Sequence, residues 1–129
     1  MIRAIRVVFR YFFKSLQMLT YGAGIVHNIR RRPWLILEIP AYLIAQTLAL
    51  VKQLRRDSDI RVIHAHWWIP QGLSAVLATF FTRRRINVIC TIHGPDLFGL
   101  TGFFWNRLRQ FVLRRCAFVI VTSPEAQRM

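Results

Sequence analysis

The residues best suited to chemistry in this 129-residue chain lie where short apolar runs end. His93 and Asp96 follow the largely apolar run at residues 88–92, and His66 follows the strand expected at residues 60–65. Near neutral pH an imidazole can donate or accept hydrogen bonds, and a carboxylate can accept them. Because open α/β folds bind ligands at the carboxyl ends of their strands, we predict that His93 and Asp96 contact substrate.

These side chains also have structural interpretations. His93 suits a structural histidine in an apolar setting, and Asp96 suits the cap of a short turn. His64 and His66 have the spacing of a metal pair, but no Cys, Asp or third His lies nearby to complete a site, so we expect no metal. We interpret His64 as a core histidine that hydrogen-bonds a neighbouring strand's loop, with His66 and Trp67 lining the cleft.

Alternating apolar segments predict the elements that position these residues. Strands are expected at residues 60–65, 86–92 and 117–122, and helices at residues 72–82 and 103–115. The strand starts are about 26 and 31 residues apart, which is typical of βαβ units, and right-handed crossovers make the strands parallel. The sequence therefore predicts an α/β fold with a Rossmann-like parallel sheet and flanking helices, and brings His66, His93 and Ser123 to one edge.

Two glycines lie at the same edge. Gly72 and Gly94 leave room for a ligand to approach the backbone. The helix that starts at Gly72 is expected to point unpaired N–H groups into the crevice, which favours a negatively charged group such as a sugar phosphate or lipid phosphate. We include Gly72, Gly94 and Ser123 among the predicted substrate-binding residues.

Residues 34–51 form a largely apolar run with a single charge, Glu38, and the run is close to the length that spans a bilayer. Glu38, Pro40 and Gln46 oppose a spanning helix. We predict a buried crossover helix starting near Pro40 and keep membrane insertion as the alternative. The apolar face expected for this helix comprises Leu43, Ile44, Thr47, Leu48, Val51 and Leu54. Earlier in the chain, residues 2–13 predict an edge strand and residues 16–32 a loop.

The chain is strongly basic, with 19 Lys plus Arg against 5 Asp plus Glu and a net charge of +14. This surplus favours an anionic partner. No nucleic-acid partner is expected, because the arginines are spread over several elements without a readout motif. Cys90 and Cys116 lie in apolar segments without metal-site spacing and are interpreted as buried reduced thiols, which favours a cytoplasmic protein.

The predicted helix at residues 103–115 mixes aromatic residues with arginines. One interpretation is an ordinary amphipathic helix with its arginines in water. The other is a face that lies on an anionic membrane surface. Exposure of Phe103, Phe104 and Trp105 favours the second.

Four segments of this sequence together resemble a known family. They are residues 21–34 (YGAGIVHNIRRRPW), 62–72 (VIHAHWWIPQG), 91–100 (TIHGPDLFGL) and 113–127 (LRRCAFVIVTSPEAQ). In this order they resemble the amino-terminal lobe of glycosyltransferase family 4, the retaining enzymes of GT-B architecture. The resemblance implies transfer of a sugar from a nucleotide-sugar donor to an acceptor hydroxyl with retention, and without a metal or other cofactor.

In that family the amino-terminal lobe mostly holds the acceptor, and the carboxyl-terminal lobe binds the donor through a Glu-x7-Glu motif. Here Glu38 and Glu125 are the only glutamates, so the motif is absent. The family's first strand and glycine-rich loop are missing too. We therefore interpret residues 1–129 as a partial amino-terminal lobe without the donor-binding lobe, truncated at both ends and inactive alone. Met1 is then an internal methionine of a longer protein.

The resemblance also implies roles for single residues. His93 hydrogen-bonds the transferring sugar or its departing phosphate and stabilises an oxocarbenium-like transition state. Gly94 allows close approach of the donor, and Asp96 orients His93 or accepts a hydrogen bond from a sugar hydroxyl. Pro95 replaces a small residue found in many relatives, which affects the geometry of Asp96. The acceptor side is implied to include His66, Trp67 and Gln71.

We predict an enzyme of polysaccharide or glycolipid synthesis whose partners are a nucleotide-sugar donor, a glycan or lipid-linked acceptor and an anionic membrane surface. It is expected in the cytoplasm, peripheral on the inner face of the plasma membrane. The alternative is a basic membrane-associated module without catalysis, in which residues 34–51 insert in the bilayer.

Overall fold

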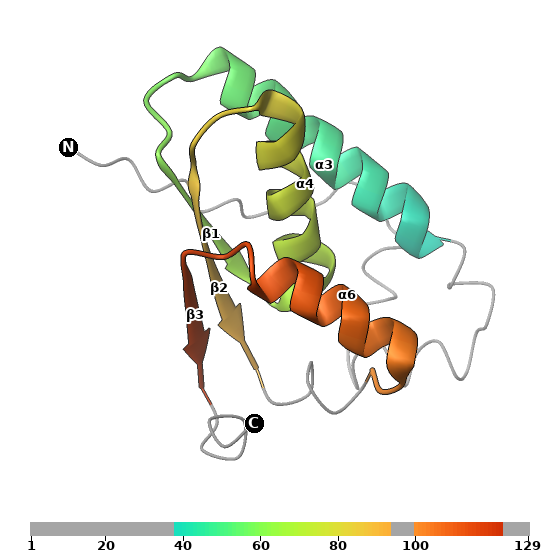
Figure 1. Cartoon of the computed structure of the whole chain (residues 1–129). Helices are drawn as coiled ribbons and strands as arrows, with labels where there is room; N and C mark the ends of the chain where they lie inside the picture. The colour runs from blue at the N-terminus through green and yellow to red at the C-terminus, as the bar shows by residue number, and fades with distance from the viewer. Residues whose placement is uncertain (1–37, 94–99, 123–129) are drawn as a thin grey trace.

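The computed structural model describes residues 38–93 and 100–122, where a three-stranded sheet lies beside helices (Figure 1). In chain order the elements are α3 (Glu38–Arg56), β1 (Val62–His66), η2 (Trp68–Gly72), α4 (Leu73–Thr82), β2 (Asn87–Ile92), α6 (Phe103–Leu113) and β3 (Phe118–Val121). The strand predicted at residues 2–13 and the loop predicted at residues 16–32 lie outside the described residues.

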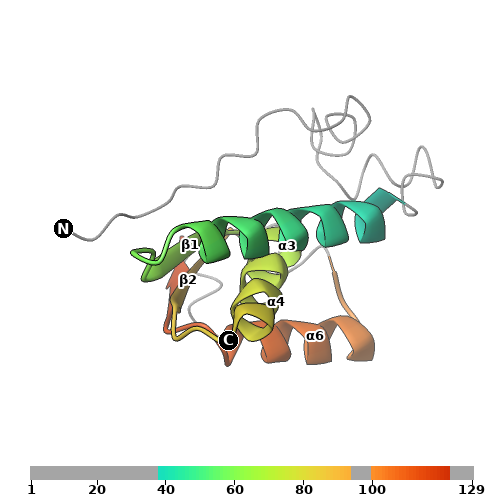
Figure 2. The same ribbon diagram turned by 90° about the horizontal axis from the view of Figure 1, so that it is seen from above.

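All neighbouring strands in the sheet are parallel, in the order β1-β2-β3. The register places Ala65 opposite Cys90, and Cys90 opposite Val119. Each crossover moves the chain one strand in the same direction, so right-handed connections put α4 and α6 on one face of the sheet. Figures 1 and 2 both show α4 between α3 and α6. The predicted α/β fold with a Rossmann-like parallel sheet is confirmed.

The sheet buries one face more completely than the other within the described residues. Side chains that point toward the helices, such as Ile63, Val88 and Cys90, are buried. On the opposite face Ile89 is half-buried and Phe118 is exposed. The regular alternation follows from the period of two along a strand.

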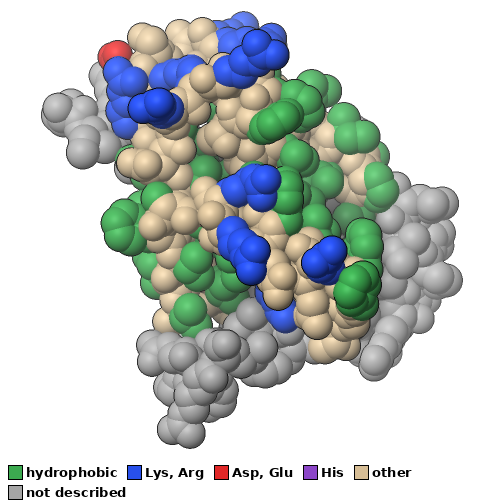
Figure 3. Space-filling view, in the orientation of Figure 1, with side chains coloured by type: hydrophobic (Ala, Val, Ile, Leu, Met, Phe, Trp, Pro, Cys, Tyr) green, Lys and Arg blue, Asp and Glu red, His purple; other side chains and the backbone are tan. Residues whose placement is uncertain are grey.

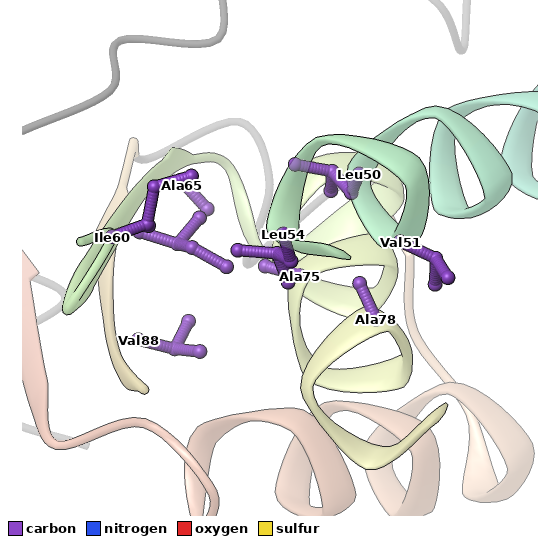
Figure 4. Packing of buried hydrophobic residues seen from close by; sticks show 9 residues of the cluster. Leu50, Val51, Leu54, Ile60, Ala65, Ala75, Ala78 and Val88 are labelled. Carbon is purple, nitrogen blue, oxygen red and sulfur yellow. The ribbon is translucent and has the colours of Figure 1, made fainter. Parts of the chain in front are cut away.

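One hydrophobic cluster joins α3, α4, β1 and β2. Its members are Leu50, Val51, Leu54, Ile60, Ile63, Ala65, Ala75, Ala78 and Val88, most of them labelled in Figure 4. Ala75 and Ala78 are fully buried, and their small side chains let α3 approach α4 closely. Between the same helices Ser74 Oγ donates a hydrogen bond to Gln46 Oε1 at 3.0 Å. This paired contact satisfies two buried polar groups.

The helix predicted in this region is confirmed as α3, and it packs on α4 through Leu50, Val51 and Leu54, whereas the strand that would precede a crossover lies outside the described residues. The predicted contact face of α3 is partly wrong. The described helix begins at Glu38, close to the predicted start near Pro40, and proline is tolerated in the first turn of a helix. Ile44 and Leu48, expected on the buried face, are exposed. Gln46 is buried instead, because its amide oxygen pairs with Ser74.

No helix within residues 38–93 or 100–122 is both long and apolar enough to cross a lipid bilayer.

A second cluster lies between η2, α4, β2 and α6. Its buried members are Trp68, Leu73, Val76, Cys90, Ile92 and Val112. Trp68 is fully buried and meets the ring of Trp105 edge-on, with centroids 6.5 Å apart. The two clusters pack α4 against α3 and α6. They also connect these helices to β1 and β2, and so fix the position of the sheet relative to α4.

Candidate active site

The structure brings His66, Trp67 and His93 together at the carboxyl ends of β1 and β2. The His66 and His93 rings are nearly parallel, with centroids 6.0 Å apart and an interplanar angle of 17°. Trp67 meets His93 edge-on, with centroids 6.4 Å apart. The expected meeting of His66 and His93 at one sheet edge is therefore confirmed, while their roles stay predictions. Gly94, Asp96 and Ser123 lie outside the described residues.

Trp67 turns the chain out of β1 with an unusual backbone conformation. Its φ is 75° and its ψ is 137°, which is uncommon for a residue with a side chain. Such conformations cost about 1–3 kcal/mol and cluster at functional sites. Two hydrogen bonds hold Trp67 in this conformation. The Trp67 N–H donates to Thr91 O at 2.7 Å, and the Gly72 N–H donates to Trp67 O at 3.0 Å.

His64 has a structural role, as predicted, although with a different partner. Its Nε2 is hydrogen-bonded to Thr91 Oγ1 at 2.8 Å. Thr91 belongs to β2 itself and not to a loop. The register places it opposite His66, so it lies next to His64 on the same face of the sheet. The His64 ring also lies 4.6 Å from that of His66. His64 thus supports the ring that faces His93.

Sequence reasoning missed Thr122, which lies beside His93. Its Oγ1 donates a hydrogen bond to Ile92 O at 3.2 Å and is 3.5 Å from His93 Nδ1. The register of β2 and β3 pairs Ile92 with Val121, so the next pair along is His93 with Thr122. That register was the signal that could have found Thr122.

Gln71 carries an unsatisfied polar atom near the same edge. Its Oε1 is buried and has no hydrogen-bond partner among the described residues. Buried acceptors of this kind are usually satisfied by protein, water or ligand. A ligand hydroxyl is one donor that suits this position.

Gly72 is buried at the start of α4, and the structure gives it a packing role. A Cβ there would meet Trp67 O at 3.2 Å, Cys90 Sγ at 3.3 Å and Val112 Cγ1 at 3.3 Å. The prediction of unpaired N–H groups at the start of α4 is wrong for Gly72 and Leu73. The Gly72 N–H bonds Trp67 O, and the Leu73 N–H bonds carbonyls of the preceding turn. Contact of Gly72 with a ligand stays a prediction.

The two thiols lie in the apolar cluster below this edge. Cys90 is fully buried, as predicted, whereas Cys116 is only half-buried, because it sits in the turn that leads into β3. A hydrogen bond with Cys90 lowers the pKa of the Cys116 thiol, against the opposing effect of burial. Within the described part of the chain, no three His, Cys, Asp or Glu side chains form a group that could hold a metal ion.

The helix that follows the site, α6, exposes two of the three aromatic residues at its start. Phe103 and Phe104 are exposed, and Trp105 is half-buried against the second cluster. The guanidinium carbon of Arg107 lies 5.5 Å from the centre of the Phe103 ring. The condition set for the membrane-facing interpretation of this helix is therefore met at Phe103 and Phe104 but not at Trp105.

Comparison with known proteins gives two findings. The model of a family described as Glycosyltransferase Family 4 matches residues 7–129. A protein of Bacillus anthracis named N-acetyl-alpha-D-glucosaminyl L-malate synthase is 25% identical over 71 residues. Those residues are 55% of this chain and 18% of that relative's length, so the chain spans a small part of the relative it matches.

Proposed function

The chain belongs to glycosyltransferase family 4, and from this premise we propose that it forms the acceptor-side part of a sugar-transferring enzyme. The proposed reaction moves a sugar from a nucleotide-sugar donor to a hydroxyl of a glycan or lipid-linked acceptor, with retained anomeric configuration and without a bound metal. The donor-binding lobe lies outside residues 1–129 in this proposal. The cytoplasmic side of the plasma membrane is the proposed location.

The meeting of His66, Trp67 and His93 is the observation that carries this proposal. These three rings lie together at the carboxyl edge of the sheet. The two imidazoles can hydrogen-bond a sugar, and the indole offers it a flat apolar surface. In the proposed mechanism His93 donates a hydrogen bond to the transferring sugar or the departing phosphate. A donor placed in advance where charge develops is an effective form of catalysis.

The acceptor is proposed to lie against Trp67 and Gln71. The buried Gln71 Oε1 supports this, since an acceptor hydroxyl would supply the hydrogen bond that it lacks among the described residues. His66, whose ring is stacked 6.0 Å from that of His93, is proposed to belong to the acceptor side as well. Gly94, Asp96 and Ser123 remain proposed contacts on the basis of family resemblance alone.

Replacement of His93 tests the proposal. In the full-length protein, His93→Ala is expected to reduce sugar transfer by about a hundredfold or more, because the hydrogen bond to the transition state is lost. Product is measured by mass spectrometry with a panel of nucleotide sugars. The name of the Bacillus anthracis relative makes nucleotide-activated N-acetylglucosamine the first donor to try.

Arg85→Ala is the matched control, because Arg85 is exposed and precedes β2 at its other end. It should transfer sugar at the parent rate. Activity of His93→Ala within a few-fold of the parent would refute the assignment of this site. The 129 residues alone are expected to show no transfer, and turnover by the purified chain would contradict the proposed division between two lobes.

A further inference from the structure

The outward surface of α6 differs from that of an ordinary amphipathic helix. Its inward side packs on the second cluster through Val112, which is fully buried, and through the half-buried Leu108. The opposite side would normally be polar. Instead Phe103, Phe104 and Phe111 are 79%, 67% and 37% exposed. Packing within the described residues does not account for these three rings.

Arginines alternate with these rings on the same side of the helix. Arg107, Arg114 and Arg115 are exposed, and the segment from Phe103 to Arg115 contains no acidic residue. The guanidinium carbon of Arg115 lies 3.9 Å from the centre of the Phe111 ring, so charge and ring are in contact. We call the six residues Phe103, Phe104, Arg107, Phe111, Arg114 and Arg115 the outer stripe. Figure 3 shows basic and hydrophobic side chains side by side where α6 lies.

We propose that the outer stripe docks on the surface of an anionic lipid bilayer. Helices that lie in a membrane interface combine exposed aromatic rings with arginine or lysine on an adjoining face. The rings would enter the boundary between headgroups and acyl chains, and the guanidinium groups would pair with lipid phosphates. Lipid is the partner that the stripe favours, because its three aromatic rings and three arginines share one side of the helix and no acidic residue lies between Phe103 and Arg115.

Docking in this way places the candidate active site at the membrane. The helix crosses back between two parallel strands, so Phe103 and Phe104 lie at its end nearer the carboxyl edge of β2, where His93 is. Figure 1 shows the amino end of α6 toward the side to which the strand arrows point. Delivery of a lipid-linked acceptor to this edge rests on the proposed function, whereas the docking itself does not.

Vesicle binding tests the proposal without any measurement of activity. The purified chain is sedimented with vesicles of phosphatidylcholine plus phosphatidylglycerol, and with vesicles of phosphatidylcholine alone. We expect sedimentation with the anionic vesicles only, decreasing as salt is raised. A chain that remains in the supernatant with both, or that binds neutral vesicles equally well, overturns the proposal.

Two variants locate the contact on the outer stripe. Phe103→Ser with Phe104→Ser removes exposed rings, and the affinity for anionic vesicles should fall by about tenfold. The matched control is Phe80→Ser with Phe81→Ser, because these rings are 74% and 57% exposed at the far end of α4. The control should bind as the parent does.

The second variant, Arg107→Gln with Arg114→Gln, should lower affinity by about 25-fold, since each arginine near an anionic surface is worth about fivefold. Arg55→Gln with Arg56→Gln removes the same charge from the exposed end of α3 and serves as its control. Equal losses in stripe and control variants would show unspecific attraction by net charge and overturn the proposal. Circular dichroism on each variant checks folding, and the arginine pair tests the stripe even if the phenylalanine pair is unstable.

Discussion

His93 has three side-chain neighbours, which come from two other segments of the chain. Trp67 follows β1, Thr122 follows β3, and the His66 ring stacks at 6.0 Å. Next to this group Thr91 is buried and hydrogen-bonded to His64, so the polar contacts extend from the edge of the sheet into β1 and β2. A ring held from several sides keeps one orientation, which a hydrogen-bonding role in transfer requires.

The hydrogen bond between His64 and Thr91 should contribute measurably to stability. Thr91→Val keeps the shape of the side chain but removes the hydroxyl, so the free energy of unfolding is expected to fall by about 1–2 kcal/mol. Thr91→Ser retains the hydroxyl and should lose less. Urea unfolding followed by circular dichroism compares the variants, and equal stability of the valine and serine forms would contradict the hydrogen bond's contribution.

The thiol of Cys116 should react at lower pH than an ordinary cysteine. Its pKa is lowered from 9.0 by the hydrogen bond with Cys90, and a lower pKa means more thiolate at any given pH below it. Cys90→Ala removes that bond and leaves burial, so the pH midpoint of alkylation should rise. Mass spectrometry after iodoacetamide treatment across pH measures it. An unchanged midpoint in Cys90→Ala would disprove the coupling, and Cys90→Ser serves as the control that keeps a polar partner.

At the scale of elements, Arg84 connects segments that are distant in sequence. Its guanidinium donates to the carbonyl of Leu54 near the end of α3 and to those of Asp57, Ser58 and Ile60 in the connection to β1, the last three at 2.6–2.9 Å. One planar side chain thus satisfies the Leu54 carbonyl, which has no partner within the helix at its end, and three carbonyls of the connection that follows.

Removal of this side chain should destabilise the fold. Arg84→Ala is expected to lower the free energy of unfolding by about 2 kcal/mol, because charge-assisted hydrogen bonds to otherwise unpaired carbonyls are lost. Arg85→Ala removes the same charge from an exposed neighbour and should cost less than about 0.5 kcal/mol. Thermal unfolding of both variants measures the difference. Similar losses in the two would contradict the role given to Arg84.

The order and type of the elements could be predicted from sequence because apolar periodicity differs between strands and helices. Every strand and helix expected from residue 60 onward occurs within a few residues of its predicted bounds. The features that could not be predicted are those that depend on hydrogen bonds between residues of different elements. Gln46 is buried only because Ser74 faces it, and the backbone of Trp67 is fixed by Thr91 and Gly72. A run of three arginines at residues 83–85 gives no sign that only the middle one is structural.

At the scale of the whole described molecule, β2 is the most buried strand and β3 is the least buried. Leu54, Ile63 and Val88 are nearly inaccessible, while Phe118, Val119 and Ile120 in β3 are exposed. The helices cover one face of the sheet, and β1 and β3 are its outer strands within the described residues. Ile63 and Ala65 are buried in β1, whereas no residue of β3 is buried. Exposed edge strands are less protected than central ones and pair readily with other chains.

Backbone amides should exchange with solvent in the same order. We expect the slowest hydrogen exchange in β1 and β2 and faster exchange in β3, because local opening is easier where few side chains are buried. Mass spectrometry of peptides after deuterium labelling measures the rates. Protection of β3 equal to that of β2 in the isolated chain would indicate a covered edge and contradict this expectation.

Thr122 and His93 each follow a strand, and their adjacency is set by the alignment of those two strands. A shift of β3 by one residue would turn Thr122 to the opposite surface of the sheet, because neighbouring side chains alternate sides. The length of the short connection between α6 and β3 therefore determines what the imidazole meets. Insertion or deletion of a single residue there that shifts β3 would therefore change the neighbour of His93, and would displace the proposed contact Ser123 as well.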